Sequence, residues 1–525
     1  MLGIEQSLVG FGESERPLIE VLGDDGAPAR TLTYREVTRR AADLAERIGP
    51  GNGRPPRVGV VCGNTPAFVV ADLALLAAHA IEVPVPLAFS AEQAAGLLAE
   101  TDLCVVDAAG QERLTQWGRD RVLPPHCTVL PLSTDGPVPS APLVLRAAGA
   151  GAGGADWECK VIHTSGTTSR PKGVRIRAGA LNELLGSLRS VMPRGAFARY
   201  LSVVPFSLLI EQVTGLYMVL LDGGTLVLTP PGRALVGTAA AAAADMLPYV
   251  AAARPTALVA TPALVDAVAT AADEAAKSGQ AVAEALFGRD EAPLLCCGGA
   301  PVHPELLRRL EDHGLPVHEG YGLSENSSVV SWNTPAARRP GTVGRPLPHV
   351  RVRIADDGEL LIRSTSLFAG YTRDDPSSLL FDADGWLRTG DLARIDEDGF
   401  ISITGRKKNV IITAAGRNVA PEWVEAQYAQ LPFVRAVAVF GDGLDALHGL
   451  FLVEESTDLA TAEAAVREFG AAQLSEVEQV AVPHLTVADE RLYRRFFTVT
   501  GRPMRAALRT ALSNGTLFDH QGADA

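Results

Sequence analysis

Short apolar segments rich in β-branched residues alternate along the chain with longer segments rich in alanine and leucine. The short segments have the length and composition of buried strands. They are Val58–Cys62, Leu103–Val106, Lys160–His163, Leu201–Val204 and Pro293–Cys297. The longer segments predict helices at Pro66–Ala80 and at Ala239–Val250, where an alanine tract favours helix. This alternation predicts an α/β fold with largely parallel sheets flanked by helices.

The pattern changes near residue 405. Downstream lies a smaller block with a basic tail, whose predicted strands and amphipathic helix are Arg435–Phe440, Gly449–Val453 and Thr461–Phe469. We therefore expect a large N-terminal domain, residues 1–405, and a small α+β C-terminal domain, residues 406–525. The boundary falls at Gly405–Lys408.

Length and charge narrow the functional classes. A chain of 525 residues is too long for one core, and 47% hydrophobic with 21% charged residues is typical of a soluble protein. The net charge of −14 argues against nucleic-acid binding, because nothing would offset phosphate repulsion. The N-terminus lacks a signal-peptide pattern, and no apolar run reaches the roughly 18 residues of a membrane span. We expect a cytoplasmic protein with no membrane span and no nucleic-acid partner.

The cysteines and histidines do not suggest a metal site. The six cysteines have neither metal-finger nor redox-pair spacing, and the ten histidines include no HExxH motif. We therefore expect reduced thiols and no protein-ligated zinc.

A hydroxyl-rich segment directly follows the predicted strand Lys160–His163. It reads Thr164-Ser165-Gly166-Thr167-Thr168-Ser169-Arg170-Pro171-Lys172-Gly173-Val174. Hydroxyls and glycine amides in one turn can surround phosphate oxygens, and a lysine supplies positive charge beside them. The GxxxxGK[ST] pattern of a P-loop is absent. On its own, the segment is as compatible with a solvated turn as with phosphate binding.

Together with later segments in the same order, this one resembles the acyl-adenylate-forming superfamily, which includes acyl-CoA synthetases, peptide-synthetase adenylation domains and luciferases. The segment Gly298-Gly299-Ala300-Pro301 is similar to the family's adenine-binding turn. The segment His318–Glu325 matches the family's YGxTE pattern, with Ser324 in place of threonine. The resemblance implies that Tyr321 stacks on adenine, next to Gly322. It also implies that Ser324 hydrogen-bonds phosphate and that Glu325 holds Mg²⁺.

Three segments nearer the C-terminus extend the resemblance over about residues 31–510. Gly385–Asp391 matches GWxxTGD, which implies that Asp391 binds the ribose hydroxyls. Gly405–Lys408 matches the segment between the domains, where Arg406 would contact ribose or phosphate and Lys408 would be the hinge of a mobile C-terminal domain. Thr500–Arg505 lies where the family has TGKxxR, which places Arg502 at the catalytic lysine position.

The implied reaction is ATP-dependent activation of an acid, release of pyrophosphate and transfer to a second nucleophile. Charge builds on the α-phosphate and the departing pyrophosphate, so catalysis is mainly electrostatic. The resemblance assigns this stabilisation to Lys172, Thr164, Thr168, Arg502, and Glu325 through Mg²⁺. It assigns nucleotide contacts to Ser165, Gly166 and Thr167.

The nucleotide motifs depart from the family pattern at two positions. Ser169 stands where glycine is commonest, and Arg502 replaces the catalytic lysine. Arginine keeps the charge but presents a broad planar fork in place of a compact ammonium. Three alternatives stay open: Arg502 serves as the cation, Arg505 takes its place, or adenylation proceeds without this contact.

The candidate acid pocket, Pro205–Glu211, departs as well. Leu208 lies near the histidine of many acyl-CoA synthetases, and Ser207 lies where amino-acid-activating domains have aspartate. An α-amino acid is disfavoured, because its buried ammonium would lack a counter-charge. Glu211 is either structural or part of the pocket. The same choice applies to the residues that follow at helical spacing: Thr214, Gly215, Tyr217 and Met218.

The leading hypothesis is activation of an acid followed by transfer to coenzyme A. Within the superfamily, the chain is similar to bacterial long-chain acyl-CoA synthetase-like proteins. These include natural-product diazotases, which activate nitrite with ATP for attack by an aromatic amine, and a diazotase is therefore the first alternative. A catalytically degenerate AMP-binding protein is the second. A separate carrier protein is an alternative acceptor.

Overall fold

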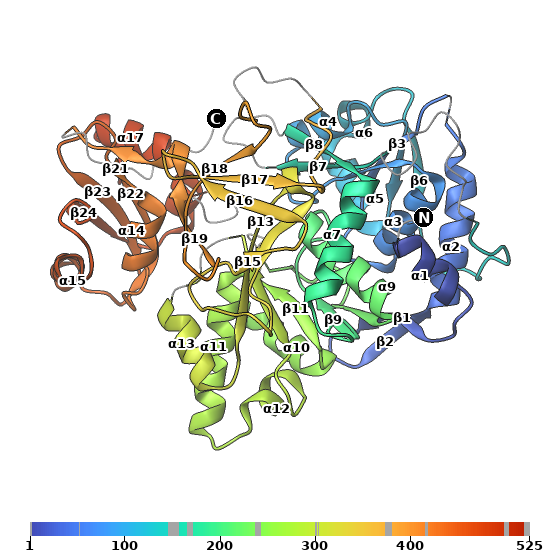
Figure 1. Ribbon diagram of the computed structural model, residues 1–525, viewed down its shortest axis with the longest axis horizontal. Helices are drawn as coiled ribbons and strands as arrows, with labels where there is room; N and C mark the ends of the chain where they lie inside the picture. The colour runs from blue at the N-terminus through green and yellow to red at the C-terminus, as the bar shows by residue number, and fades with distance from the viewer. Residues whose placement is uncertain are drawn as a thin grey trace. The chain divides into compact units, whose positions relative to one another are not determined.

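The structure of the chain is a computed structural model. It describes residues 3–51, 53–144, 157–164, 172–236, 243–299, 302, 304–372, 381–414, 418–497 and 503–518. These residues divide into two compact units (Figure 1). The first holds the described residues within Met1–Val236, Ala240–Arg351 and Arg363–Leu379, and the second those within Val352–Ile362 and Leu380–Ala525.

A nine-stranded sheet spans much of the first unit, in the order β15-β14-β13-β12-β11-β9-β10-β1-β2. Its strands are β1 (Pro17–Leu22), β2 (Pro28–Thr33), β9 (Arg199–Ser202), β10 (Thr225–Leu228), β11 (Ala257–Ala260), β12 (Leu294–Gly298), β13 (Val317–Leu323), β14 (Ser328–Trp332) and β15 (Arg345–Pro346). Neighbouring strands in the run β13-β12-β11-β9-β10-β1 are parallel. Strands β14 and β15 at one edge of the sheet and β2 at the other edge pair antiparallel.

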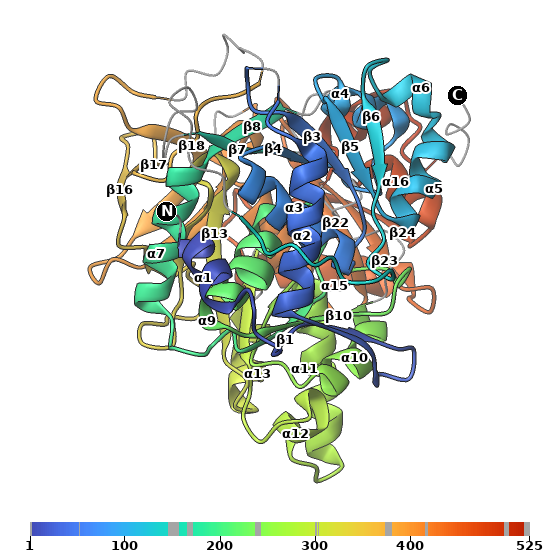
Figure 2. The ribbon, with the colours of Figure 1, turned by 90° about the vertical axis from the view of Figure 1, so that its right-hand side faces the viewer.

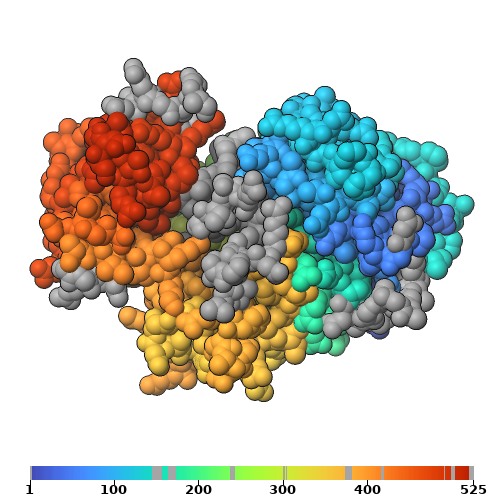
Figure 3. Space-filling view, turned by 90° about the horizontal axis from the view of Figure 1, so that it is seen from above, coloured from blue at the N-terminus to red at the C-terminus, as the bar shows by residue number. Residues whose placement is uncertain are grey.

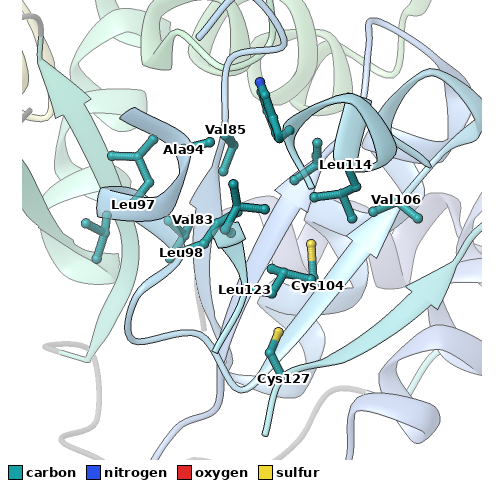
Figure 4. Packing of buried hydrophobic residues seen from close by; sticks show 14 of the residues in the cluster. Val83, Val85, Ala94, Leu97, Leu98, Cys104, Val106, Leu114, Leu123 and Cys127 are labelled. Atoms are coloured by element: carbon teal, nitrogen blue, oxygen red, sulfur yellow. The ribbon is translucent and has the colours of Figure 1, made fainter. Parts of the chain in front are cut away.

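A six-stranded sheet in the same unit has the order β6-β5-β3-β4-β7-β8. Its strands are β3 (Arg57–Val61), β4 (Ile81–Pro84), β5 (Leu103–Val106), β6 (Thr128–Pro131), β7 (Glu158–Thr164) and β8 (Lys172–Arg177). All neighbours are parallel except β7 and β8, which form an antiparallel hairpin. This sheet buries an apolar cluster that includes Val83, Leu98, Cys104 and Leu114 (Figure 4).

Helical segments cover these sheets. They are α1 (Gly3–Phe11), α2 (Tyr34–Ile48), α3 (Pro66–Ala78), α4 (Ala91–Leu98), α5 (Ala108–Trp117), α6 (Arg119–Val122), α7 (Ala178–Val191), α8 (Leu209–Glu211), the π-helix η2 (Gln212–Met218), α9 (Val219–Asp222), the 3₁₀ turn η3 (Ala243–Met246), α10 (Leu247–Ala253), α11 (Pro262–Lys277), α12 (Val282–Phe287), α13 (Pro304–Asp312) and the 3₁₀ turn η4 (Ser324–Asn326). Helix α11 packs on β11 and β12, and α13 packs on β13. Helix α2 packs along α3 (Figure 2), and every residue of α3 is buried.

The second unit contains three smaller sheets. One has the order β16-β17-β18-β19, one pairs β20 with β21, and one has the order β22-β23-β24. Their strands are β16 (Val350–Ile354), β17 (Glu359–Ser364), β18 (Leu387–Ile395), β19 (Ile401–Arg406), β20 (Ile411–Ile412), β21 (Asn418–Val419), β22 (Val434–Phe440), β23 (Leu447–Val453) and β24 (Val480–Val487). Its helical segments are the 3₁₀ turn η5 (Lys407–Asn409), α14 (Pro421–Tyr428), α15 (Leu459–Gln473), α16 (Glu490–Phe496) and α17 (Arg505–Ser513).

The β22–β24 sheet carries an apolar cluster on each face. Successive side chains of a strand point to opposite faces, so neighbouring residues of β22 join different clusters. Val437 and Val439 join a cluster with Val424 and Tyr428 of α14. Ala438 and Phe440 join a second cluster with α16 and α17. The residues of this unit are coloured mainly orange to red in the space-filling view (Figure 3).

The expected α/β class is confirmed, with parallel sheets, flanking helices and a smaller α+β unit at the C-terminal end. Of the predicted helix Ala239–Val250, residues 239–242 lie outside the described residues, and the described part is helical but is not one continuous α-helix. Residues Ala243–Met246 form a 3₁₀ turn, and α10 begins at Leu247. Pro248 lies in the first turn of α10, where its missing N–H is tolerated, and it would break a continuous helix. The domain boundary at Gly405–Lys408 stays a prediction.

No described helix combines the length and apolar character needed to cross a membrane.

Candidate active site

The hydroxyl-rich segment begins and ends in the β7–β8 hairpin. Thr164 is the last residue of β7 and lies opposite Lys172, the first residue of β8. The structure therefore brings the two predicted phosphate-binding residues to the same rung of the ladder. Ser165, Gly166, Thr167, Thr168 and Ser169 lie outside the described residues. Thr164 is at the carboxyl end of a strand that is parallel to β4, and this is the edge where α/β sheets bind ligands.

The predicted adenine-binding turn follows β12. Gly298 lies opposite Gly320 of β13, and a Cβ atom on Gly298 would come within 3.1 Å of the Gly320 carbonyl oxygen. Gly299 has φ of +83°, a conformation that favours glycine. The end of β12 is therefore backbone without side chains, exposed at Gly298 and Gly299. Ala300 and Pro301 lie outside the described residues.

The segment from Tyr321 to Glu325 forms the carboxyl end of β13 and a tight turn. A Cβ atom on Gly322 would lie 1.8 Å from the Ser328 carbonyl oxygen, so this position requires glycine. Ser324 and Glu325 are in the 3₁₀ turn η4. Ser327 and Ser328, which follow, have φ of 55° and 117°, a strained backbone of the kind found at ligand-binding turns. The turn is thus fixed by its backbone.

Tyr371 was missed by the sequence analysis, although it contacts a predicted site residue. Its hydroxyl donates a hydrogen bond to Glu325 Oε1 at 2.7 Å. The backbone amide of Phe368 also donates to the Glu325 carbonyl oxygen at 2.9 Å. These two hydrogen bonds hold both the carboxylate and the backbone carbonyl of Glu325. The only signal in the sequence was a glycine–tyrosine pair, Gly370-Tyr371, shortly after a strand.

The same segment, residues 367–372, also runs along β8. The amide of Thr372 donates to the Gly173 carbonyl oxygen at 2.8 Å, and the amide of Arg175 donates to the Gly370 carbonyl oxygen at 3.0 Å. A Cβ atom on Gly173 would lie 2.7 Å from Thr372 Cγ2, so glycine is needed for this close approach. One short segment therefore connects the Thr164–Lys172 hairpin with Glu325.

In the second unit, Asp391 and Arg406 are brought together. They lie opposite each other on β18 and β19, and Arg406 Nε is 2.7 Å from Asp391 Oδ1. The Asp391 side chain is 3% exposed, whereas that of Arg406 is 43% exposed. The sequence analysis assigned Asp391 to ribose and Arg406 to ribose or phosphate, and their pairing is consistent with a shared ligand.

Glu359 is a second residue that the sequence analysis missed. It is buried on β17, accepts from the Gly390 amide at 2.9 Å, and pairs with Arg388 at 2.7 Å and Lys407 at 2.9 Å. Burial raises the pKa of Glu359, but Lys407, the Gly390 amide and Arg388 outweigh it and lower the pKa. Glu359 therefore organises the turn that carries Asp391. The only feature of the sequence that marked Glu359 was its charge next to the apolar residues of its strand.

Three cations are candidates for the hinge and for the catalytic lysine position, and the structure describes two of them, Lys408 and Arg505. Lys408 is exposed in η5. Arg505 donates to both carboxylate oxygens of Glu425 at 2.6 Å and to the Val439 carbonyl oxygen at 3.0 Å. This bidentate pair favours a structural role for Arg505 over replacement of the catalytic lysine. Arg502 lies outside the described residues.

The candidate acid pocket begins after β9. Leu208 is 45% exposed, whereas every residue of η2 is buried, including Thr214 and Tyr217. Glu211 is fully buried and accepts from the Tyr200 hydroxyl at 2.8 Å. Burial raises the pKa of Glu211 to about 8, which favours the neutral carboxyl. The role of these residues in acid binding stays a prediction.

The two units are described separately, so the convergence of Thr164, Tyr321 and Asp391 around one ATP also stays a prediction. The described site residues form one group in each unit. Thr164, Lys172 and Glu325 are linked in the first, and Asp391 and Arg406 are paired in the second.

Comparisons with known proteins point in one direction. Residues 15–372 match the family described as AMP-binding enzyme. A long-chain-fatty-acid–CoA ligase, FadD15 of Mycobacterium bovis, is 30% identical over 470 residues, covering 79% of this chain and 76% of the relative. A feruloyl-CoA synthase of Amycolatopsis sp is 28% identical over 432 residues, covering 78% and 80%. The crystal structure of the anthranilate CoA ligase AuaEII with anthranoyl-AMP superposes with a TM-score of 0.78 at 19% identity, covering 98% of this chain and 97% of the other.

Proposed function

Because the chain belongs to the family of AMP-binding enzymes, we propose that it activates a carboxylic acid as its acyl-adenylate and passes the acyl group to coenzyme A. Membership confirms the expectation of an ATP-using, AMP-forming ligase of the acyl-CoA synthetase type over a nucleotide-binding protein without activity. The observation that carries the proposal is the connection of the Thr164–Lys172 hairpin to Glu325 by residues 367–372.

In the first step, a carboxylate oxygen of the acid attacks the α-phosphorus of ATP, and pyrophosphate leaves. Negative charge builds on the phosphate oxygens, and Lys172 with the neighbouring amides stabilises it. Tyr321 stacks on adenine above the bare backbone of Gly298 and Gly299. Asp391 accepts hydrogen bonds from the ribose hydroxyls, and Arg406 orients Asp391.

Glu325 is the residue that we assign to Mg²⁺. A carboxylate is the ligand that this hard cation prefers. Tyr371 donates a hydrogen bond to Oε1 and thereby orients the carboxylate that would hold the cation. When bound with ATP, the ion would neutralise charge on the phosphates.

In the second step, the thiol of coenzyme A attacks the acyl carbonyl carbon, and AMP leaves. We assign the hinge between the two steps to Lys408 and the first-step cation to Arg502. The buried apolar side chains of η2, those of Val213, Leu216 and Met218, support an acid with an apolar chain or ring. The printed names of the relatives, a long-chain-fatty-acid–CoA ligase and a feruloyl-CoA synthase, support the same class.

Pyrophosphate release tests the proposal. The purified chain is incubated with ATP, Mg²⁺ and a panel of fatty and aryl acids, with and without coenzyme A. We expect acid-dependent pyrophosphate release, and thioester only when coenzyme A is present. Lys172→Ala and Glu325→Ala should abolish release, whereas Lys277→Ala, at the end of α11, should leave it unchanged. Failure of every acid would overturn the proposal.

The panel includes nitrite because two substitutions favour a diazotase as the second candidate. Leu208 lies near the position where many acyl-CoA synthetases have a histidine, and Arg502 replaces the usual catalytic lysine. Nitrite-dependent release of pyrophosphate, with no response to any carboxylic acid, would establish this candidate instead. Acyl transfer to a phosphopantetheinyl carrier but not to coenzyme A would establish a carrier protein as the acceptor.

A further inference from the structure

The interior of the first unit contains a group of three charged residues that the nucleotide site does not use. Lys160 lies on β7, Asp72 on α3 and Glu82 on β4, and each side chain is at most 1% exposed. The Lys160 ammonium contacts both carboxyl groups. We call these three residues the buried charge cluster.

Burying such a cluster is costly, and apolar residues of similar size are often at least as stabilising. The cluster limits this cost by sharing charge. Burial raises the pKa of Glu82, the nearby Asp72 adds to this rise, and Lys160 opposes it. Burial lowers the pKa of Lys160, but Asp72 and Glu82 outweigh it and raise the pKa above its ordinary value. One ammonium therefore faces two carboxyl groups, and burial favours the neutral form of Glu82.

Two further contacts connect the cluster to η2. The Tyr217 hydroxyl donates to Asp72 Oδ1 at 2.7 Å, and Gln212 Nε2 lies 3.3 Å from Glu82 Oε1. Lys160 Nζ also lies 5.4 Å from the centre of the Tyr217 ring. Thus Gln212 and Tyr217, at both ends of the π-helix, are anchored to the same three residues. A π-helix is a rare conformation that is frequently found at functional sites.

The cluster also belongs to the strand of the phosphate-binding hairpin. Lys160 is four residues before Thr164 on β7. On the other side, η2 continues α8, which packs against β14, the partner strand of the Tyr321 strand. The cluster therefore connects the hairpin strand with the helix of the candidate acid pocket.

We propose that Lys160, Asp72 and Glu82 are positioning residues that hold η2 in its π-helical conformation and so set the shape of the acid pocket. The effect on acid binding rests on the proposed function, because it requires the acid to bind beside η2. ATP binds at the carboxyl ends of β7, β12 and β13 in that proposal, so its binding should depend less on the cluster.

Tyr217→Phe tests the cluster by removing one hydroxyl and leaving the ring. The matched control is Tyr34→Phe. Tyr34 is equally buried, on α2, and its hydroxyl donates to the Gly224 carbonyl oxygen at 2.8 Å, outside the cluster. Each variant loses one buried hydrogen bond, so both should melt at a lower temperature than the parent chain. Hydrogen exchange of residues 209–222 and the KM values for acid and for ATP are measured in both variants.

In Tyr217→Phe we expect faster exchange within η2 and a rise of about fivefold in the KM for the acid, with the KM for ATP unchanged. In Tyr34→Phe neither should change. The proposal is overturned if exchange in η2 is the same in both variants, or if the two KM values rise together. If the parent chain releases no pyrophosphate with any acid, the proposed function fails, and the exchange measurement still decides whether the cluster holds η2.

Discussion

The two carboxylates that we assign to the nucleotide, Glu325 in the first unit and Asp391 in the second, are held in contrasting ways. Glu325 is placed by a strained backbone turn and a neutral hydroxyl, that of Tyr371. Asp391 is placed by the opposite charge of Arg406, close to the ion pairs of Glu359. The first unit therefore fixes Glu325 by backbone geometry and neutral hydrogen bonds, whereas the second fixes Asp391 by an ion pair whose arginine reaches solvent. The two should respond differently to crowding substitutions, pH and salt.

The largest effect should come from Gly322→Ala, which attacks the backbone of the Glu325 turn. The added Cβ would overlap the Ser328 carbonyl oxygen at 1.8 Å, so the turn must move. We expect a loss of about 3 kcal/mol or more in the free energy of unfolding, with loss of adenylation. Urea unfolding measures it. Gly320→Ala is the control on the same strand, because its Cβ would meet only ordinary contacts, the nearest at 3.4 Å. Equal losses in the two variants would contradict the account.

The pH dependence of stability tests the burial of Glu211. Burial raises its pKa from 4.5 to about 8, so the folded state keeps a proton that the unfolded state has lost between these values. The stabilising contribution is complete below pH 4.5 and is lost as pH rises through about 8, with a slope near 1.4 kcal/mol per pH unit. Glu211→Gln should flatten the decline between pH 5 and 8, measured by urea unfolding at each pH. An unchanged slope would show that Glu211 is ionised in the fold.

Removing one hydroxyl from the Glu325 site should have a moderate effect. Tyr371→Phe deletes the hydrogen bond to Glu325 Oε1, and we expect kcat/KM to fall about tenfold. More Mg²⁺ should be needed for half-maximal activity, because the carboxylate is less well oriented. Titration of adenylation with Mg²⁺ measures both. Tyr249→Phe, which removes a hydroxyl bonded to Arg233, serves as the control and should leave both quantities unchanged.

The smallest effect should come from Lys407→Met in the second unit. Lys407 is 42% exposed, so its pairing with Glu359 is screened by solvent, and Arg388 remains as a partner. We expect a loss of about 0.5 kcal/mol at low ionic strength, and none in high salt. Urea unfolding at two salt concentrations measures it. A loss of stability that persists in high salt would show that this ion pair is not screened by solvent and would contradict the contrast between the two units.

The elements that the sequence predicted best are those determined by local pattern. The apolar run Leu103–Val106 is β5 as predicted, because both its faces are buried. The strand predicted at Leu201–Val204 begins earlier, at Arg199, because that arginine pairs with Glu20 and its charge conceals its place in the strand. A single polar residue in a strand carries no local sign of a distant partner.

The same limit applies to the candidate site. The hairpin residues Thr164 and Lys172 were predicted from one continuous motif, and they do lie opposite each other. Tyr371 was missed because its contact with Glu325 joins residues 46 positions apart and no pattern in either segment indicates it. The buried charge cluster was missed for the same reason, since Lys160 was counted within an apolar strand.

The completely buried helix α3 has a consequence for synthesis of the chain. Asp72, in the middle of α3, pairs with Lys160 and Tyr217, which are 88 and 145 positions further along. As the protein leaves the ribosome, an apolar helix with an acidic residue on it must wait for these partners to be translated. The nascent chain therefore exposes an apolar segment until residue 217 emerges, and we expect chaperones to bind this segment. We also expect versions of the protein truncated before residue 217 to aggregate.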